Sequence, residues 1–225
     1  MKHLRAVLES FNAKERFWLI AAATGHAGLS DDFRRELGGA IGVDVPSSAW
    51  WAIDYHLDWV EAALLSVDAQ VGDVFSEPEV GRNLNRNQQD VDMIIAWDVG
   101  DVTQVAFVEA KGVTSWGNDQ YAAKLERLVG LFGVDARGYA GIKPVFVLAS
   151  PSRPQKLALS GTPAWALDKS GRPNWIRLDV PNNLRRPERC DADGKPLKAG
   201  KFWHVVPRKV PGTAGGGNTA PSASE

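Results

Sequence analysis

Two apolar segments separated by a short turn-forming spacer constrain the fold of this chain most strongly. Residues 91–97 read VDMIIAW, residues 104–111 read QVAFVEAK, and residues 98–101 (DVGD) lie between them. Both segments are rich in the β-branched and aromatic residues that strands favour, so we predict an antiparallel hairpin. A further buried strand is expected over residues 143–150 because of their Val, Phe and Leu content.

Helical patterns surround these strands. Asn12 and Glu15 have the spacing of a capping box before an amphipathic segment that ends near Gly25. Apolar residues at spacings of three and four predict further helices, which cover residues 30–37, residues 47–63 and residues 118–133. This order of elements predicts an α/β fold with a mixed central sheet flanked by helices.

The C-terminal part of the chain shows weaker strand patterns. We expect a hairpin formed by residues 165–167 and 175–178, and a last strand over residues 202–206. Between the predicted helices and the central hairpin, residues 71–75 have the composition of a short strand followed by a loop. The C-terminal segments therefore predict extra strands after the core.

The composition changes along the chain predict its domain organisation. An N-terminal helical segment covers residues 1–45, and an α/β domain covers residues 46–210. Within that domain we expect a core over about residues 47–150 and a basic, β-rich extension over residues 151–210. Residues 211–225 are rich in Gly, Ala, Ser and Pro and are expected to be disordered.

Charge and cysteine content limit the setting in which the protein works. Residues 1–150 hold 13 Lys and Arg against 21 Asp and Glu, whereas residues 151–225 hold 13 against 6. A basic end of this kind suits an anionic partner, or docks on the acidic half of the chain itself. Cys190 is the only cysteine, and the first residues lack the pattern of a signal peptide, so we predict a cytoplasmic protein without a membrane span.

Polar residues occur in the central strands at places where packing alone does not explain them. Side chains alternate across a strand, so Glu109 and Lys111 point to one face. Because the hairpin loop is short, we expect Asp92, near the start of its strand, to lie opposite them. Two carboxylates are suitable ligands for Mg²⁺ or Mn²⁺, and the backbone oxygen of Ala110 can serve as a further ligand. A lysine beside them can stabilise charge on a phosphate.

This arrangement of Asp92 on one strand and Glu109-Ala110-Lys111 on the next resembles the PD-(D/E)xK nuclease superfamily. The resemblance implies a restriction-endonuclease-like core, with Asp92 and Glu109 as metal ligands and Lys111 as the catalytic lysine. Gln120 is similar to the helix glutamine of the exonuclease-like branch, which usually has Tyr where this chain has Lys124. Val91 stands where the family often has Pro.

Other acidic residues compete for or add to this site. Asp90 is a rival for the position of Asp92, although it lies outside the apolar run. On the predicted helix over residues 47–63, Asp54, Asp58 and Glu61 form an acidic stripe. Many members of the resembled family take a metal ligand from this helix, so Glu61 is a candidate; the alternative is a solvated stripe.

Basic residues near the predicted site and in the C-terminal extension are candidate nucleic-acid contacts. Arg185 and Arg186 lie in the extension, whereas Arg82 and Arg86 precede Asp92. Lys124 on the following helix is a further candidate contact, and Trp116 is a candidate base-stacking group. The alternative for the extension is a solvated basic face.

The sequence therefore predicts a Mg²⁺- or Mn²⁺-dependent nuclease that cleaves phosphodiester bonds, in DNA in preference to RNA. One alternative is a catalytically inactive nucleic-acid-binding protein on the same fold. Another is a protein-interaction module, which would bind no divalent ion. The N-terminal helices either cover the core or form an interface with a second copy or a partner protein, and their periodicity fits both.

Overall fold

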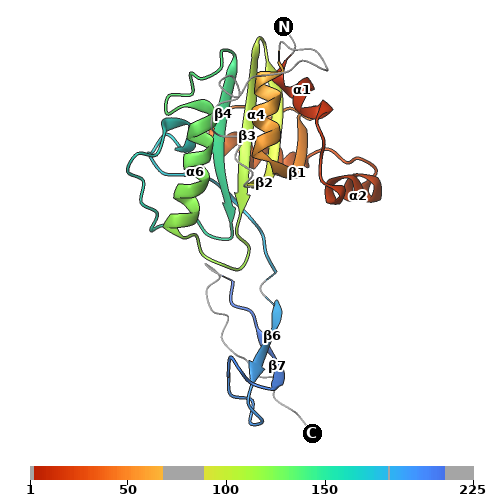
Figure 1. The fold of residues 1–225 in the computed structure, drawn as a ribbon, viewed down its shortest axis with the longest axis vertical. Helices are drawn as coiled ribbons and strands as arrows, with labels where there is room; N and C mark the ends of the chain where they lie inside the picture. The colour runs from red at the N-terminus through yellow and green to blue at the C-terminus, as the bar shows by residue number, and fades with distance from the viewer. Residues whose placement is uncertain (1–2, 68–88, 182, 211–225) are drawn as a thin grey trace.

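Five strands form one mixed sheet in the order β1-β2-β3-β4-β5 (Figure 1). The computed structural model describes residues 3–67, 89–181 and 183–210. The strands are β1 (Trp50–His56), β2 (Asp90–Val99), β3 (Val102–Ala110), β4 (Ile142–Ser150) and β5 (Asn174–Arg177). Strand β2 is antiparallel to both β1 and β3, whereas β4 is parallel to β3 and β5 is parallel to β4.

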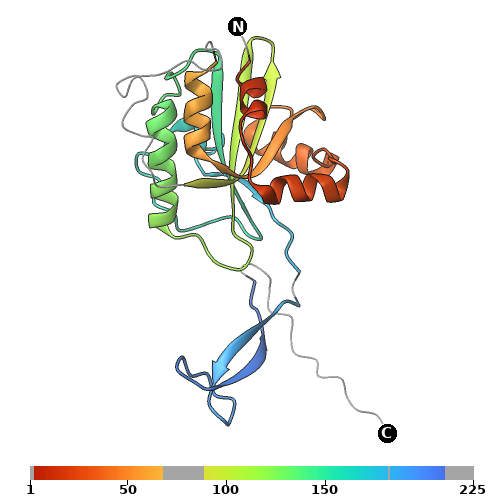
Figure 2. The ribbon, with the colours of Figure 1, turned by 45° about the vertical axis from the view of Figure 1, so that its right-hand side comes forward.

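Helices cover both faces of this sheet, as Figures 1 and 2 show. The helices are α1 (Leu4–Ser10), α2 (Glu15–Thr24), α3 (Asp31–Ile41), α4 (Leu57–Leu65) and α6 (Asn118–Phe132), with a short 3₁₀ helix η1 (Ala164–Ala166). Helices α4 and α6 lie side by side over one face of the sheet. Helix α3 packs on the other face, where Leu37 is part of the buried hydrophobic cluster. The fold is therefore a mixed sheet between two helical layers, as predicted.

Side-chain alternation along β3 divides the core into two layers. Val105 and Phe107 pack with the side chains of α4 and α6, whereas Ala106 and Val108 pack on the α3 side. All four residues are buried. The next residue, Glu109, continues the first series, so the alternation of a strand directs it toward α4 and α6.

Most elements with a strong local signal are confirmed. The predicted hairpin is β2 and β3, the predicted strand over residues 143–150 is β4, and the helix over residues 118–133 is α6. Helix α2 ends at Gly25, which adopts a left-handed backbone with φ of 67°. Helix α3 begins after Ser30, whose side chain accepts a hydrogen bond from the Phe33 N–H, and runs past the predicted end to Ile41.

The helix predicted over residues 47–63 is wrong in its first half. Residues Trp50–His56 form strand β1, and only Leu57–Leu65 are helical. Aromatic and β-branched residues in this half favour a strand, and β1 pairs along β2 with Ile53 opposite Met93. Pairing with a distant segment therefore decides between two local patterns that both fit.

The hairpin predicted from residues 165–167 and 175–178 is also wrong. The first segment is the 3₁₀ helix η1, followed by an isolated bridge between Leu167 and Pro173, and the second segment is β5. Asn174 of β5 is buried, and its amide donates to the backbone oxygens of Phe146 and Trp165. These hydrogen bonds fix β5 beside β4 at the edge of the sheet.

A separate two-stranded hairpin follows, and it projects from the α/β body (Figures 1 and 2). It pairs β6 (Arg185–Cys190) with β7 (Phe202–Pro207). Strand β7 confirms the strand predicted over residues 202–206, whereas β6 was not predicted. No helix among the described residues has the length and apolar content needed to cross a membrane. The predicted strand over residues 71–75 and the predicted disordered tail over residues 211–225 lie outside the described residues.

Candidate active site

The carboxylates of Asp92 and Glu109 come from neighbouring antiparallel strands. Met93 pairs with Val108, so the next position along each strand places Asp92 opposite Glu109. The Ala110 N–H donates a hydrogen bond of 2.7 Å to Asp92 Oδ2. This bond turns the Asp92 carboxylate toward the end of β3, where Glu109 and Lys111 lie.

Glu109 is mostly buried, and a lysine of α6 faces it. Lys124 Nζ lies 2.7 Å from Glu109 Oε1, and both side chains are less than 20% exposed. Burial raises the pKa of Glu109 above its ordinary value, while the charge of Lys124 and its hydrogen bond lower it. The nearby charge of Asp92 raises this pKa and that of Lys111 lowers it. All four groups therefore interact electrostatically.

Lys111 follows the last residue of β3 and keeps the strand direction. Its N–H donates to the Ala149 oxygen at 2.8 Å, so the backbone there remains paired with β4. Its ammonium lies over the Trp116 ring, 5.7 Å from the ring centroid, within the usual range of a cation–π contact. Trp116 therefore holds Lys111 at the same sheet edge as Glu109.

Helix α6 presents a polar stripe to this edge. Gln120 is exposed in the first turn, and Lys124 lies one turn further on. The ammonium of Lys124 donates to the backbone oxygen of Asp90 as well as contacting Glu109. Lys124, which is also a predicted nucleic-acid contact, thus ties α6 to the start of β2 and the end of β3.

Asp90, the rival candidate, is occupied by other partners. His56 Nδ1 lies 2.5 Å from Asp90 Oδ1, and Lys14 contacts Oδ2. Both carboxylate oxygens of Asp90 are thus engaged, whereas Asp92 is exposed and uses Oδ2 alone in the hydrogen bonds made by the described residues. The structure therefore favours Asp92 as the open carboxylate.

Glu61 belongs to a second cluster, in the interface of α4 and α6. It is 4% exposed, and its Oε2 lies 3.5 Å from Arg127 Nη2. The same guanidinium nitrogen lies 2.5 Å from Asp58 Oδ1. Asp54, the third member of the predicted acidic stripe, is in β1 and pairs with Arg16 at 3.3 Å. The predicted stripe on a single helix is therefore not formed.

The donors at the sheet edge fit a hard cation, but they are few. Within residues 3–67, 89–181 and 183–210, no three His, Cys, Asp or Glu side chains are grouped so that they could hold a metal ion. Asp92 and Glu109 provide two carboxylates, and the backbone oxygen of Ala110 lies between Glu109 and Lys111 in the chain. Mg²⁺ commonly takes one or two protein carboxylates and completes its shell with water and phosphate, so this donor set suits it.

The predicted nucleic-acid contacts fall into two groups. Arg185 and Arg186 are exposed on β6, where Arg186 pairs with Glu188 at 2.8 Å. Arg82 and Arg86 lie outside the described residues.

The role of Lys14 was not predicted: this residue precedes α2, and its contact with Asp90 joins the start of α2 to the start of β2 across 76 residues. No signal along the chain links two positions so far apart. Comparison with protein-family models, with curated proteins and with solved structures finds no match to this chain.

Proposed function

We propose that this protein is a metal-dependent nuclease that hydrolyses phosphodiester bonds, in DNA in preference to RNA. The observation that carries the proposal is the meeting of Asp92, Glu109 and Lys111 at one end of the β2–β3 hairpin. Two carboxylates and an ammonium at one open edge combine cation binding with stabilisation of an anionic phosphate. The same three residues carry the resemblance to the PD-(D/E)xK superfamily.

Asp92, Glu109 and the backbone oxygen of Ala110 would hold Mg²⁺ or Mn²⁺. When bound, such an ion neutralises charge on the phosphate and lowers the pKa of a water molecule. Glu109 must be ionised to bind it, and burial opposes ionisation by raising the pKa of this carboxyl. The ammonium of Lys124, 2.7 Å from Oε1, works in the opposite direction: it lowers the pKa of Glu109 and orients its carboxylate.

Lys111 is the residue we expect beside the scissile phosphate. Its ammonium lies over Trp116, which orients it without consuming its charge in an ion pair. Among the described residues it has no ion-pair partner within 4.0 Å. Its charge is therefore available to a phosphate oxygen that gains negative charge during hydrolysis.

The exposed hairpin of β6 and β7 supports nucleic acid as the substrate. Residues 183–210 hold eight Lys and Arg against three Asp and Glu. Arg185 and Arg186 are exposed there, and Arg189 lies over the ring of exposed Trp203, 4.4 Å from its centroid. Arginine contacts to phosphates give affinity with little sequence preference.

The experiment that tests the proposal is cleavage of labelled linear, circular and single-stranded DNA, and of RNA, with Mg²⁺, Mn²⁺ or EDTA. We expect metal-dependent cleavage that Asp92→Ala and Lys111→Ala abolish while circular dichroism shows a retained fold. Lys143→Ala is the matched control, because Lys143 is exposed at the opposite end of the parallel strands. Cleavage of circular DNA identifies an endonuclease.

The competing functions give different results in the same experiment. A catalytically inactive nucleic-acid-binding protein retards DNA in a gel and cleaves none of these substrates. A protein-interaction module does neither, and calorimetry finds no binding of Mg²⁺ or Mn²⁺. Wild-type protein that neither cleaves nor binds divalent ions therefore refutes the nuclease proposal.

A further inference from the structure

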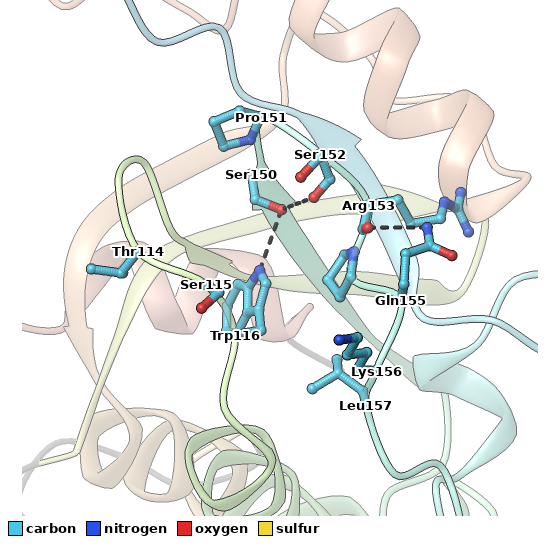
Figure 3. Close-up of a pocket in the computed structure, with 11 residues that line it drawn as sticks. Thr114, Ser115, Trp116, Ser150, Pro151, Ser152, Arg153, Gln155, Lys156 and Leu157 are labelled. Carbon is cyan, nitrogen blue, oxygen red and sulfur yellow. Dashed lines mark hydrogen bonds between the residues drawn. The ribbon is translucent and has the colours of Figure 1, made fainter. Parts of the chain in front are cut away.

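A pocket opens beyond the ends of the parallel strands β3 and β4 (Figure 3). Its volume is about 360 Å³, which falls within the usual range of small-ligand sites. One wall is formed by residues 114–116, which come after β3, and the other by residues 150–157, at the end of β4 and after it. The lining residues are Thr114, Ser115, Trp116, Ser150, Pro151, Ser152, Arg153, Pro154, Gln155, Lys156 and Leu157.

The chemistry of this lining suits an anionic ligand with a planar part. The lining contains hydroxyl groups, one indole and two cations, and it contains no Asp or Glu. Arg153 is paired with Asp168 at 2.7 Å, so its charge is largely balanced. Lys156 is exposed and has no ion-pair partner in the part of the chain that the structure describes. Lys156 is therefore the cation available to an anionic group.

Hydrogen bonds around Ser150 hold the pocket in shape. The hydroxyl oxygen of Ser150 accepts from the indole N–H of Trp116 at 3.3 Å and from that of Trp175 at 3.0 Å. The Ser150 hydroxyl donates to the backbone oxygen of Ser152 at 2.9 Å (Figure 3). Ser150 itself is 4% exposed, so this anchor is buried. The indole of Trp116 is therefore positioned before any ligand arrives, which lowers the entropic cost of binding.

The pocket adjoins the candidate active site. Trp116 lines the pocket, and the ammonium of Lys111 lies 5.7 Å from the centroid of its ring. Because β3 and β4 are parallel, Lys111 and Ser150 leave the sheet at the same edge. Ligands of α/β sheets commonly bind outside the carboxyl ends of parallel strands.

We infer that this pocket binds one nucleotide of a nucleic-acid strand, with its base against Trp116 and its phosphate near Lys156. Only one part of this inference rests on the proposed function, namely that the bound nucleotide belongs to a nucleic-acid strand. An indole is a sequence-tolerant stacking surface, and a lysine recognises phosphate as a point charge. The pocket thus holds the nucleotide that neighbours the phosphate beside Lys111, and so sets where the strand is cut.

The test is calorimetric titration of the full chain with thymidine, inorganic phosphate, thymidine monophosphate and a single-stranded oligonucleotide, all in EDTA at low salt. We expect the monophosphate to bind more tightly than thymidine or phosphate alone. Trp116→Ala should weaken its binding on the order of tenfold, whereas Trp116→Phe should retain most of it. Lys156→Glu should weaken the binding of thymidine monophosphate and leave the binding of thymidine unchanged. The control is Trp18→Ala, which replaces an exposed tryptophan on α2.

The outcomes separate this inference from the proposed function, because binding is measured without metal. Monophosphate binding that depends on Trp116 and Lys156 supports the pocket even when the protein cleaves nothing. Cleavage of DNA by a protein whose monophosphate binding is absent, or unchanged in both Trp116→Ala and Lys156→Glu, overturns the pocket and leaves the nuclease standing. Binding of the monophosphate but not of the oligonucleotide identifies a free-nucleotide site and overturns the assignment to a strand.

Discussion

Helix α6 faces two acidic clusters that differ in what their charges can do. Lys124 contacts Glu109 at the edge of the sheet, and Arg127, about one turn further along the helix, contacts Asp58 and Glu61 of α4. Lys124 thus pairs with one carboxylate of β3, and Arg127 pairs with two carboxylates of α4. Burial raises the pKa of both Glu61 and Glu109.

The difference lies in what remains open. In the α4–α6 cluster a single guanidinium meets both carboxylates, and the side chains of Arg127 and Glu61 are 12% and 5% exposed. At the sheet edge, Asp92 is exposed and Lys111 contacts an aromatic ring instead of a carboxylate. A buried and saturated ion pair holds helices together, whereas charges held apart at an open edge can receive an ion or a phosphate. Proximity of acids alone therefore does not identify the site.

The largest expected effect is on the rate of DNA cleavage, which should depend on Glu109 and not on Glu61. Glu109→Gln removes a proposed metal ligand and should reduce the cleavage rate by at least about 10³-fold, because metal stabilisation of the transition state is worth several kcal/mol. Glu61→Gln should leave the rate within a few fold of wild type. Initial rates of DNA cleavage in Mg²⁺ measure both.

Glu126→Gln, an exposed substitution on the same helix, serves as the control for α6. Equal losses of activity in Glu109→Gln and Glu61→Gln, with both variants folded, would mean that the two clusters form one functional site.

The next largest effect is on the free energy of unfolding, and it should come from the α4–α6 cluster. Arg127→Met leaves Glu61 buried without its cation and should reduce the free energy of unfolding by about 3–5 kcal/mol. Adding Glu61→Gln to this variant should restore part of the loss, since the uncompensated charge is removed. Urea denaturation followed by circular dichroism provides the measurement.

Arg137→Met is the matched control, because Arg137 is 86% exposed and its pair with Asp135 lies at the surface. Such surface pairs contribute at most about 1 kcal/mol. An unfolding free energy of Arg127→Met equal to that of this control would show that the α4–α6 cluster is not a structural ion pair.

The sequence predicted the parts of the fold whose signals are local. Strands β2 and β3 are joined by a two-residue turn, and α6 has apolar residues at helical spacing, so both could be identified from neighbouring residues. Strand β1 could not, because Leu57, Val60 and Leu64 continue a helical spacing back through residues that pair with β2. Strand β5 has four residues, and it depends on contacts of Asn174 with segments up to 28 residues away.

The candidate site divides in the same way. Alternation along β3 predicts that Glu109 and Lys111 share a face, and the short turn brings Asp92 opposite them. The contact of Lys124 with Asp90 spans 34 residues and requires α6 to pack over the sheet. The pairing of Glu61 with Arg127 spans 66 residues, so the sequence did not reveal that Glu61 lies in a different cluster from Asp92 and Glu109.

A smaller effect concerns metal ions and folding together. Mg²⁺ at ten times its dissociation constant should stabilise the wild type by about 1.4 kcal/mol, since it binds only the folded state. For a chain of this size that raises the melting temperature by about 3–6 °C. Glu61→Gln should respond like the wild type, whereas Glu109→Gln should not respond; thermal melts with and without Mg²⁺ decide between these outcomes.

The smallest effect is the pH dependence of stability without metal. Burial raises the pKa of Glu109 in the folded state above the value near 4.5 of the unfolded chain, so the fold favours the protonated carboxyl. The advantage of the protonated form is present below the unfolded pKa and is lost as the pH rises through the folded pKa. Glutamine keeps an oxygen acceptor for Lys124 and never ionises, so Glu109→Gln should have a higher urea midpoint than wild type at pH 8. The difference should shrink as the pH falls toward 4.5, and a difference that grows instead would mean that Lys124 stabilises the Glu109 carboxylate by more than burial opposes it.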